Sequence, residues 1–454
     1  MNTTLFTQKS INKPTLKRTL LMSMIAMSMG GMGVSAQAQT AQNSQQEIEQ
    51  LRQEVQALRA LVEQQQKQTA TLNTAVQTQQ AAAASAKPVM KLASGAEFNL
   101  YGNVRADASY QAEGGSSARM YNQINTVPLE GTVPLEGVGE RSDEFKSTLS
   151  ATRLGMDFKA PVGAGDKALS GKIEVDFLGG DKFDNLRIRH AYMSYANWLI
   201  GQTWSNFAVP DYLPETVDAL AYAGGSIKRT PQVRYTSTFS PATNLVLAVE
   251  DPKDATITGI KQRLPALTAR LNHKFADNLS VSARAMGNEK RVKEDEEMAW
   301  GVGLGAKYEV VPGTTLKADY YHVKGDSSFV TYANKGVVAD ITDNLYQSEF
   351  DSISVGITQQ FNDKLRGTLG YGYMSFDQDA GYIDALSADD KTKTNKDLWQ
   401  AWANVFYSPT KPLSFGLEYV YGERKALEAA TNGSDTGVDN RINAVAIYNF
   451  KNIA

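Results

Sequence analysis

Residues 185–207, with the sequence NLRIRHAYMSYANWLIGQTWSNF, limit the possible folds of this chain more than any other segment. The pattern is typical of two strands joined by a tight turn, because apolar and polar side chains alternate along it. Leu186 and Ile188 share one face of the first strand, and Arg187 and Arg189 share the other. This is unusual for a soluble sheet, whose buried face is dry and whose exposed face is mixed. It favours a wall with lipid on the apolar side and a water-filled lumen on the arginine side.

The same alternation recurs along the rest of the chain, up to Phe450. Ile173 and Val175, for example, alternate with Lys172 and Glu174. A soluble all-β sandwich is the alternative, but its single dry core gives no reason for charged residues at alternate positions of nearly every strand. We therefore expect an all-β transmembrane fold, an antiparallel outer-membrane β-barrel of about 16 strands, preceded by an α-helical segment.

Short and long connections alternate between the expected strands, as in a barrel with one rim of turns and one rim of loops. The short turns are 161–166, 311–314, 362–364 and 409–412, and the long polar connections are 111–146, 289–297, 325–348, 378–396 and 424–438. The first long connection contains the hexapeptide TVPLEG twice in tandem, at 126–131 and 132–137. Duplication in a tolerant surface loop explains this repeat, and nothing in the sequence supports a binding role for it.

Residues 1–38 are typical of a cleaved export signal. A positive region precedes a short apolar core at 20–34, and AQA at 36–38 offers a cleavage site. The alternative is a transmembrane anchor, for which the core is too short. Removing four positive charges from 46 basic and 49 acidic residues leaves 42 against 49, a mature net charge of −7. The four basic residues are Lys9, Lys13, Lys17 and Arg18.

Residues 39–80 are predicted to form a coiled-coil helix, followed by an Ala-rich linker at 81–95 that leads to the barrel domain at 96–454. Apolar residues recur in the helix at alternating spacings of three and four, which is a heptad pattern. Because so narrow a stripe has nothing in its own chain to bury it, we expect self-association; a solvated, partly frayed helix is the alternative. The heptad pattern favours a two-stranded coiled coil only weakly, because polar residues interrupt the row of apolar core positions. Its apolar positions are Ile48, Leu51, Val55, Leu58, Val62, Leu72 and Val76.

Catalysis and metal binding are poorly supported. The chain has no cysteine, and His190, His273 and His322 fall on the apolar side of their strands in the expected register. The GVGLG sequence at 301–305 lies within a strand pattern and opens no helix, so close packing explains it better than nucleotide binding. The net charge of −3 argues against a nucleic-acid partner. We therefore expect no enzyme, no cofactor and no metal.

Basic residues outnumber acidic ones on the predicted lumen face of the first nine strands. The planar fork of arginine matches a carboxylate, so converging arginines can replace the water shell of an anionic solute. Any single one of them is explained equally well as a solvated group or as the partner of a neighbouring acid. Together they favour a pore with anion preference. The set is Arg105, Arg153, Lys172, Arg187, Arg189, Arg234, Arg270 and Arg284.

The segment after Trp204 lacks strand alternation for about 25 residues, a length that usually indicates function or disorder. Apolar anchors such as Phe207 and Tyr222 favour a constriction loop that folds into the lumen and narrows it. Acidic residues on this loop, opposite a basic wall, would create a transverse field that orients charged solutes. The charged residues of the loop are Asp211, Glu215, Asp218, Lys228 and Arg229.

Six motifs together resemble the DcaP-like outer-membrane porin family. They are SATRLGMDFKAP (150–161), GKIEVDFLGG (171–180), LRIRHAYMSY (186–195), WLIGQTWSNF (198–207), RTPQVRY (229–235) and GLEYVYGER (416–424). With the signal and heptad segments, the resemblance spans almost the whole chain. It implies a 16-stranded trimeric barrel in the bacterial outer membrane, an N-terminal periplasmic coiled coil, and uptake of dicarboxylates and related small anions. Within the matching motifs, Arg187, Arg189 and Arg234 are the expected solute contacts.

Two functions follow as hypotheses. The first is a passive diffusion channel for small anions, with outer-membrane lipid and two further copies of the chain as partners. The second is a structural outer-membrane protein that spaces the membrane from the cell wall through its coiled coil, with a non-selective pore. The end of the chain departs from the usual pattern, because KNIA follows Phe450 where an aromatic residue commonly ends such barrels.

Overall fold

The computed structural model describes residues 90–91, 95–115, 120–132, 142–162, 168–180, 183–252, 262–293, 295–431 and 433–451. They belong to one compact unit, Lys87–Ala454. The expected export signal, the coiled coil and most of the linker lie outside the described residues, as do the second TVPLEG copy and residues 452–454. These features remain predictions.

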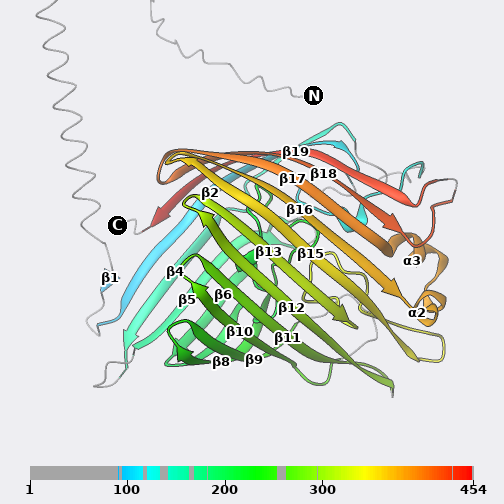
Figure 1. Cartoon of the computed structure of the whole chain (residues 1–454), viewed down its shortest axis with the longest axis horizontal. Coiled ribbons are helices and arrows are strands. Elements are labelled where there is room, and N and C mark those ends of the chain that lie inside the picture. Colours follow the sequence, from blue (N-terminus) through cyan, green and yellow to red (C-terminus); the bar gives the residue numbers. More distant parts are fainter. Residues whose placement is uncertain are drawn as a thin grey trace, which may run out of the picture. The chain divides into compact units, whose positions relative to one another are not determined.

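The described chain forms a closed antiparallel β-barrel (Figure 1). Its sheet has 19 strands, of which β1 (Met90–Lys91), β3 (Glu144–Thr148) and β14 (Val337–Ala339) are short additions. The other 16 form the wall, which closes where β19 pairs with β2. The all-β, 16-stranded prediction is therefore confirmed. The wall strands are β2 (Glu97–Glu113), β4 (Arg153–Pro161), β5 (Ala168–Gly179), β6 (Asn185–Tyr195), β7 (Trp198–Trp204), β8 (Arg229–Ser240), β9 (Thr243–Glu250), β10 (Ala266–Ala276), β11 (Leu279–Val292), β12 (Asp295–Val311), β13 (Thr314–Lys324), β15 (Leu345–Asn362), β16 (Leu365–Gln378), β17 (Asn395–Thr410), β18 (Leu413–Ala426) and β19 (Thr436–Lys451).

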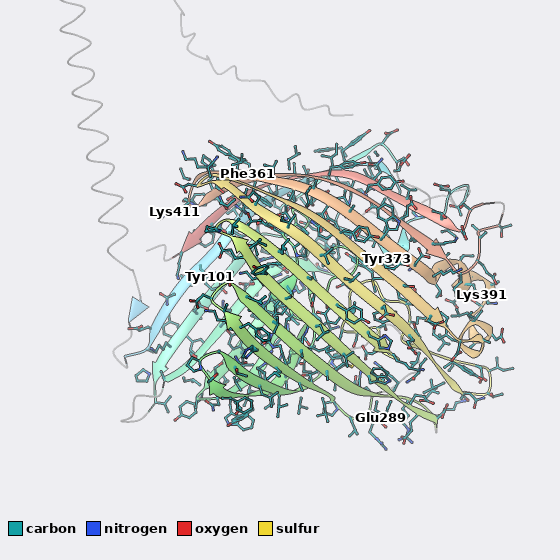
Figure 2. All side chains as sticks on the ribbon, viewed as in Figure 1. Tyr101, Glu289, Phe361, Tyr373, Lys391 and Lys411 are labelled. Atoms are coloured by element: carbon teal, nitrogen blue, oxygen red, sulfur yellow. The ribbon has the colours of Figure 1, made fainter. Side chains whose placement is uncertain are left out.

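The two rims of the barrel differ in the length of their connections, as the sequence predicts. In Figure 2, Phe361 and Lys411 lie at the rim of short turns, and Glu289 and Lys391 lie at the opposite rim. The long connections at that second rim contain β14 and two short helices, α2 (Ala380–Ala385) and α3 (Ala388–Lys393). None of the helices in the described residues is long and apolar enough to cross a membrane.

The prediction of a long polar connection at 289–297 is wrong. Residues 289–297 form a hairpin, in which β11 runs to Val292 and β12 begins at Asp295. Charged side chains continue the cross-strand pairing beyond the apolar part of the wall, where Arg291 of β11 lies 4.0 Å from Glu296 of β12. Arg263, which precedes β10, adds contacts to Glu289 at 2.8 Å and to Glu296 at 3.5 Å. Opposite charges on neighbouring strands stabilise the ladder, so polar sequence here does not indicate a loop.

Apolar residues predicted to face outward are exposed on the outer wall. Leu154 is 48% exposed, Ile173 48% and Leu304 58%, whereas the intervening Glu174 is buried. A row of exposed aliphatic side chains around a closed barrel is what lipid contact requires. The inward and outward sets of these strands therefore match the register expected from the sequence.

The register is wrong for the second half of β6, where a bulge shifts it by one residue. Glu174 of β5 pairs with His190, but Val175 pairs with Ile188, so Arg189 is the extra residue. A bulge of this kind places neighbouring side chains on the same face. His190 is consequently buried on the lumen side and not on the apolar side, with its Nδ1 3.0 Å from Oγ1 of Thr203.

Apolar side chains from three connections meet inside the loop end of the barrel and form one buried cluster. Ile124 and Val127 come from the first long connection, Phe207 from the segment after β7, and Phe329 and Val330 from the segment after β13. They pack against inward-facing wall residues, among them Tyr321, Phe350, Met374 and Leu398. This cluster fills part of the barrel with protein, so water occupies less of the interior than the strand count suggests.

Candidate functional site

The constriction loop, residues 205–228 between β7 and β8, lies inside the barrel and reaches its far wall. Nζ of Lys317 on β13 donates to the carbonyl oxygen of Leu213 at 3.0 Å. The Trp402 indole on β17 donates to the carbonyl oxygen of Glu215 at 3.1 Å, and Glu418 on β18 accepts from the backbone NH of Val217 at 2.9 Å. Backbone hydrogen bonds to wall side chains hold the loop across the lumen.

The three carboxylates of the loop form ion pairs with three different wall strands. Asp211 lies 3.8 Å from Arg270 on β10, and Glu215 forms two hydrogen bonds to Arg366 on β16, at 2.8 and 2.7 Å. Asp218 lies 3.3 Å from Arg441 on β19. The sequence predicted that these carboxylates would place negative charge opposite the basic wall. Their ion pairs with wall arginines compensate that charge. The carboxylates act as anchors of the loop.

Asp218 is the most deeply buried of these anchors. Its Oδ2 accepts from the backbone NH of Asn122 at 2.9 Å, and its Oδ1 accepts from the backbone NH of Leu220 at 2.7 Å. Burial raises the pKa of Asp218 to about 6, against the opposing effect of the Arg441 guanidinium. The same environment raises the pKa of Tyr222, mainly through burial. This carboxylate therefore joins the first long connection, the constriction loop and the wall.

Glycines on the inner wall make room for the loop. A Cβ at Gly301 would lie 3.1 Å from Cζ of Phe207, and one at Gly356 would lie 2.6 Å from Cβ of Pro214. At Gly305 a Cβ would overlap the ring of Tyr212. The GVGLG sequence is thus explained by close packing, because its glycines face the lumen where the loop crosses.

Two of the predicted solute contacts, Arg187 and Arg189, form ion pairs with acids of the adjacent strand. Arg187 donates to both carboxylate oxygens of Asp176 at 2.9 and 2.7 Å. Arg189 donates to Glu174 at 2.6 Å and to Asp176 at 3.0 Å. The Arg187 side chain keeps 30% of its surface exposed, whereas Asp176 keeps 1%. Asp176 lies behind Arg187, whose guanidinium contacts the lumen, whereas Arg189 keeps 6% of its side chain exposed and Glu174 keeps 10%.

Three other arginines of this wall have no carboxylate partner among the described residues. Neither Arg153 nor Arg229 forms a side-chain hydrogen bond or ion pair within that part of the chain, and Arg229 stacks over Trp204 at 4.5 Å. Arg234 donates to neutral groups, the Gln232 side chain at 2.8 Å and the Trp204 carbonyl oxygen. Positive charge on the wall is therefore concentrated at Arg153, Arg229 and Arg234.

Of the remaining predicted cations, Arg105 and Arg284 are placed less favourably for contact with a solute, whereas Lys172 is about as exposed as Arg187. Arg105 pairs with Asp107 and donates to the carbonyl oxygen of Val217, so it clamps the loop. Arg284 is fully buried beneath the loop, against Asp319. Lys172 lies 3.3 Å from Asp157, and its side chain keeps 29% of its surface exposed. Lys228 ends the constriction loop, where its carbonyl oxygen accepts from the backbone NH of Ser205.

Sequence reasoning missed the residues of the far wall that hold the loop. Arg366, Glu418 and Arg441 occupy alternate, lumen-facing positions of their strands, and the last two are buried. The alternation marked them as lumenal, but no local signal showed that the loop covers them. Among the described residues, no group of three or more histidines and acids is placed to hold a metal ion.

A closed 16-stranded barrel with an apolar outer wall, an inward-folded loop and lumenal arginines defines a bacterial outer-membrane porin, a class of channel proteins. The model of the DcaP outer membrane protein family matches residues 27–450, and the chain belongs to this family. The outer membrane channel DcaP of Acinetobacter baumannii is 36% identical, with a TM-score of 0.71, over 80% of this chain and 99% of that one.

More distant structures share the fold alone. The anion-selective porin from Comamonas acidovorans is 12% identical, with a TM-score of 0.54 over 78% of this chain and 100% of that one. The trimer form of OmpT, an outer membrane protein of Vibrio cholerae, is 16% identical, with a TM-score of 0.51 over 78% of this chain and 99% of that one. No significant match was found among the curated proteins.

Proposed function

We propose that this porin is a passive diffusion channel that prefers small anions, with dicarboxylates as the favoured solutes. The observation that carries the proposal is the uneven charge of the wall formed by β4, β5, β6 and β8. Four guanidinium groups, those of Arg153, Arg187, Arg189 and Arg229, surround two carboxylates, those of Glu174 and Asp176. Four positive charges against two negative ones leave an excess of two.

The solute moves down its own gradient, without a cofactor or an energy source. Guanidinium groups are permanent cations with a planar arrangement of donors, so they substitute for the water around a carboxylate. Arg234 continues the basic surface along β8, whereas Arg270 on β10 faces Asp211 of the constriction loop. A dianion gains from two such cations at once, which favours dicarboxylates over chloride.

The mature chain is proposed to act as a homotrimer, with its coiled coil in the periplasm and residues 1–38 removed on export. The heptad pattern at 48–76 supports self-association, and the trimer form of OmpT, a distant structure of the same fold, supports threefold assembly. Contact of the coiled coil with the cell wall is part of the same proposal. Cross-linking of the purified protein before and after removal of residues 39–80 tests it, since loss of trimers on removal is expected.

Ion selectivity of single channels tests the function. Purified protein in a planar bilayer is exposed to a KCl gradient, and the zero-current potential is measured, followed by the permeability of succinate relative to chloride. We expect the sign that indicates anion preference and a succinate permeability at least equal to that of chloride. Cation preference, or a barrel that does not conduct, would contradict the proposal.

A further inference from the structure

The lumenal carboxylates of β5 hold the donors that a solute carboxylate needs. Asp176 takes the two parallel donors of Arg187, at 2.9 and 2.7 Å, and a third donor from Arg189, at 3.0 Å. Glu174 takes the remaining bonded donor of Arg189 at 2.6 Å. A planar carboxylate in contact with the fork of arginine is the geometry with which a solute anion would bind.

Hydrogen bonds from the barrel wall hold these two carboxylates in position. The Tyr101 hydroxyl donates to Oε2 of Glu174 at 2.9 Å, and the backbone NH of Leu178 donates to Oδ1 of Asp176 at 3.2 Å. The bulge at Arg189 places both arginines of β6 against this pair of acids. Arg187 keeps 30% of its side chain exposed and Asp176 keeps 1%, so a solute meets Arg187 before this acid. At the second pair Arg189 keeps 6% and Glu174 keeps 10%, so a solute reaches neither group ahead of the other.

We propose that Glu174 and Asp176 are specificity-determining residues that compete with the solute for Arg187 and Arg189 and thereby limit how long an anion stays bound. The proposal rests on the anion preference proposed above. A solute carboxylate gains a guanidinium contact only as the wall carboxylate loses one, which keeps binding weak. Conduction requires a site that attracts the ion and still releases it. Without the two acids, the four arginines would form a strongly attractive site.

Neutral isosteric substitutions test this competition. Glu174→Gln and Asp176→Asn keep the shape of each side chain and remove its charge, so the arginines become available to the solute. The measurement is the interruption of single-channel chloride current by succinate. We expect longer interruptions and a lower half-blocking concentration, by about tenfold for each substitution, since charge-assisted hydrogen bonds are the strong ones.

Glu250→Gln is the matched control. Glu250 is a fully buried carboxylate of β9 that accepts from the Thr230 and Thr268 hydroxyls, both at 2.7 Å, and from the backbone NH of Asn206 at 2.8 Å. Removing its charge alters the lumen field without releasing a guanidinium group from an ion pair. We expect a duration of succinate interruptions that stays within about twofold of the unmodified protein, because Glu250→Gln leaves every arginine of β6 in its ion pair.

The outcomes separate this inference from the proposed function. If the unmodified channel is not anion-selective, the proposed function fails. If it is anion-selective and Glu174→Gln leaves the interruptions unchanged, or Glu250→Gln lengthens them equally, the competition is overturned. Asp176 is more deeply buried than Glu174. Where Asp176→Asn does not yield a folded barrel, Glu174→Gln decides the question alone.

Discussion

The wall formed by β4 to β8 and the wall formed by β15 to β19 carry the same kinds of charged residue and use them differently. In the first, Arg187 pairs with an acid of the neighbouring strand and keeps 30% of its side chain exposed. In the second, Arg441 pairs with Asp218 of the constriction loop and keeps 2%. Arg187 therefore contacts the solute path, whereas the loop covers Arg441.

The difference follows from where the constriction loop begins. It leaves the barrel between β7 and β8 and crosses to β13, β17 and β18, where hydrogen bonds hold it. The wall it leaves keeps Arg187 at the lumen surface, and the wall it reaches holds Arg441 beneath the loop. Removing an arginine from the covered wall should therefore mainly lower stability. Removing arginines from the wall that the loop leaves should mainly change ion selectivity.

The largest effect on stability is expected from Arg441→Ala on the covered wall. This change leaves Asp218 and Asp439 buried without their cation, which costs about 3–5 kcal/mol in the free energy of unfolding. Urea unfolding of the purified barrel measures it through tryptophan fluorescence, because Trp402 packs against Tyr222 of the loop at 4.8 Å. An equally large loss from Arg153→Ala would remove the distinction between the walls.

A smaller effect is expected from Gly356→Val on the same covered wall. The new side chain would meet Pro214 and the backbone carbonyl oxygen of Leu369, 2.8 Å from its Cβ, so overpacking costs about 1–3 kcal/mol. Displacement of the loop should also change single-channel conductance. Gly287→Ala is the control, since its Cβ would meet only Met298, at 3.9 Å. Unchanged conductance in Gly356→Val would show that the loop does not set the pore width.

The smallest effect on stability, and the clearest one on selectivity, is expected from Arg153→Ala combined with Arg229→Ala. These arginines have no ion pair within the described residues, so only packing over Trp204 is lost, at a cost of about 1 kcal/mol or less. The zero-current potential should move towards that of a non-selective pore. Arg291→Ala removes a charge beside Glu296 at the rim and serves as the control. Equal shifts in both variants would assign selectivity to overall charge.

Local alternation identified most of the fold, because each strand of a barrel has one lipid face and one lumen face. It failed at Arg189, where one inserted residue moved His190 to the lumen side. A bulge depends on the hydrogen bonds of two adjacent strands, and the sequence of one strand does not record it. It also failed at residues 289–297, where the cross-strand pair of Arg291 with Glu296 and the contacts of Arg263 hold polar sequence in a hairpin.

The sequence by itself determined the barrel, its rims and the lumen face of the arginines, since these depend on the period of the strand and on the chemistry of turns. Only the tertiary structure decided which of those arginines face the solute path. Arg105 and Arg284 were equivalent to Arg153 and Arg234 as predicted inward cations, but a loop from elsewhere in the chain covers the first two. Burial depends on contacts between distant segments, and such contacts leave no periodic signal within a strand.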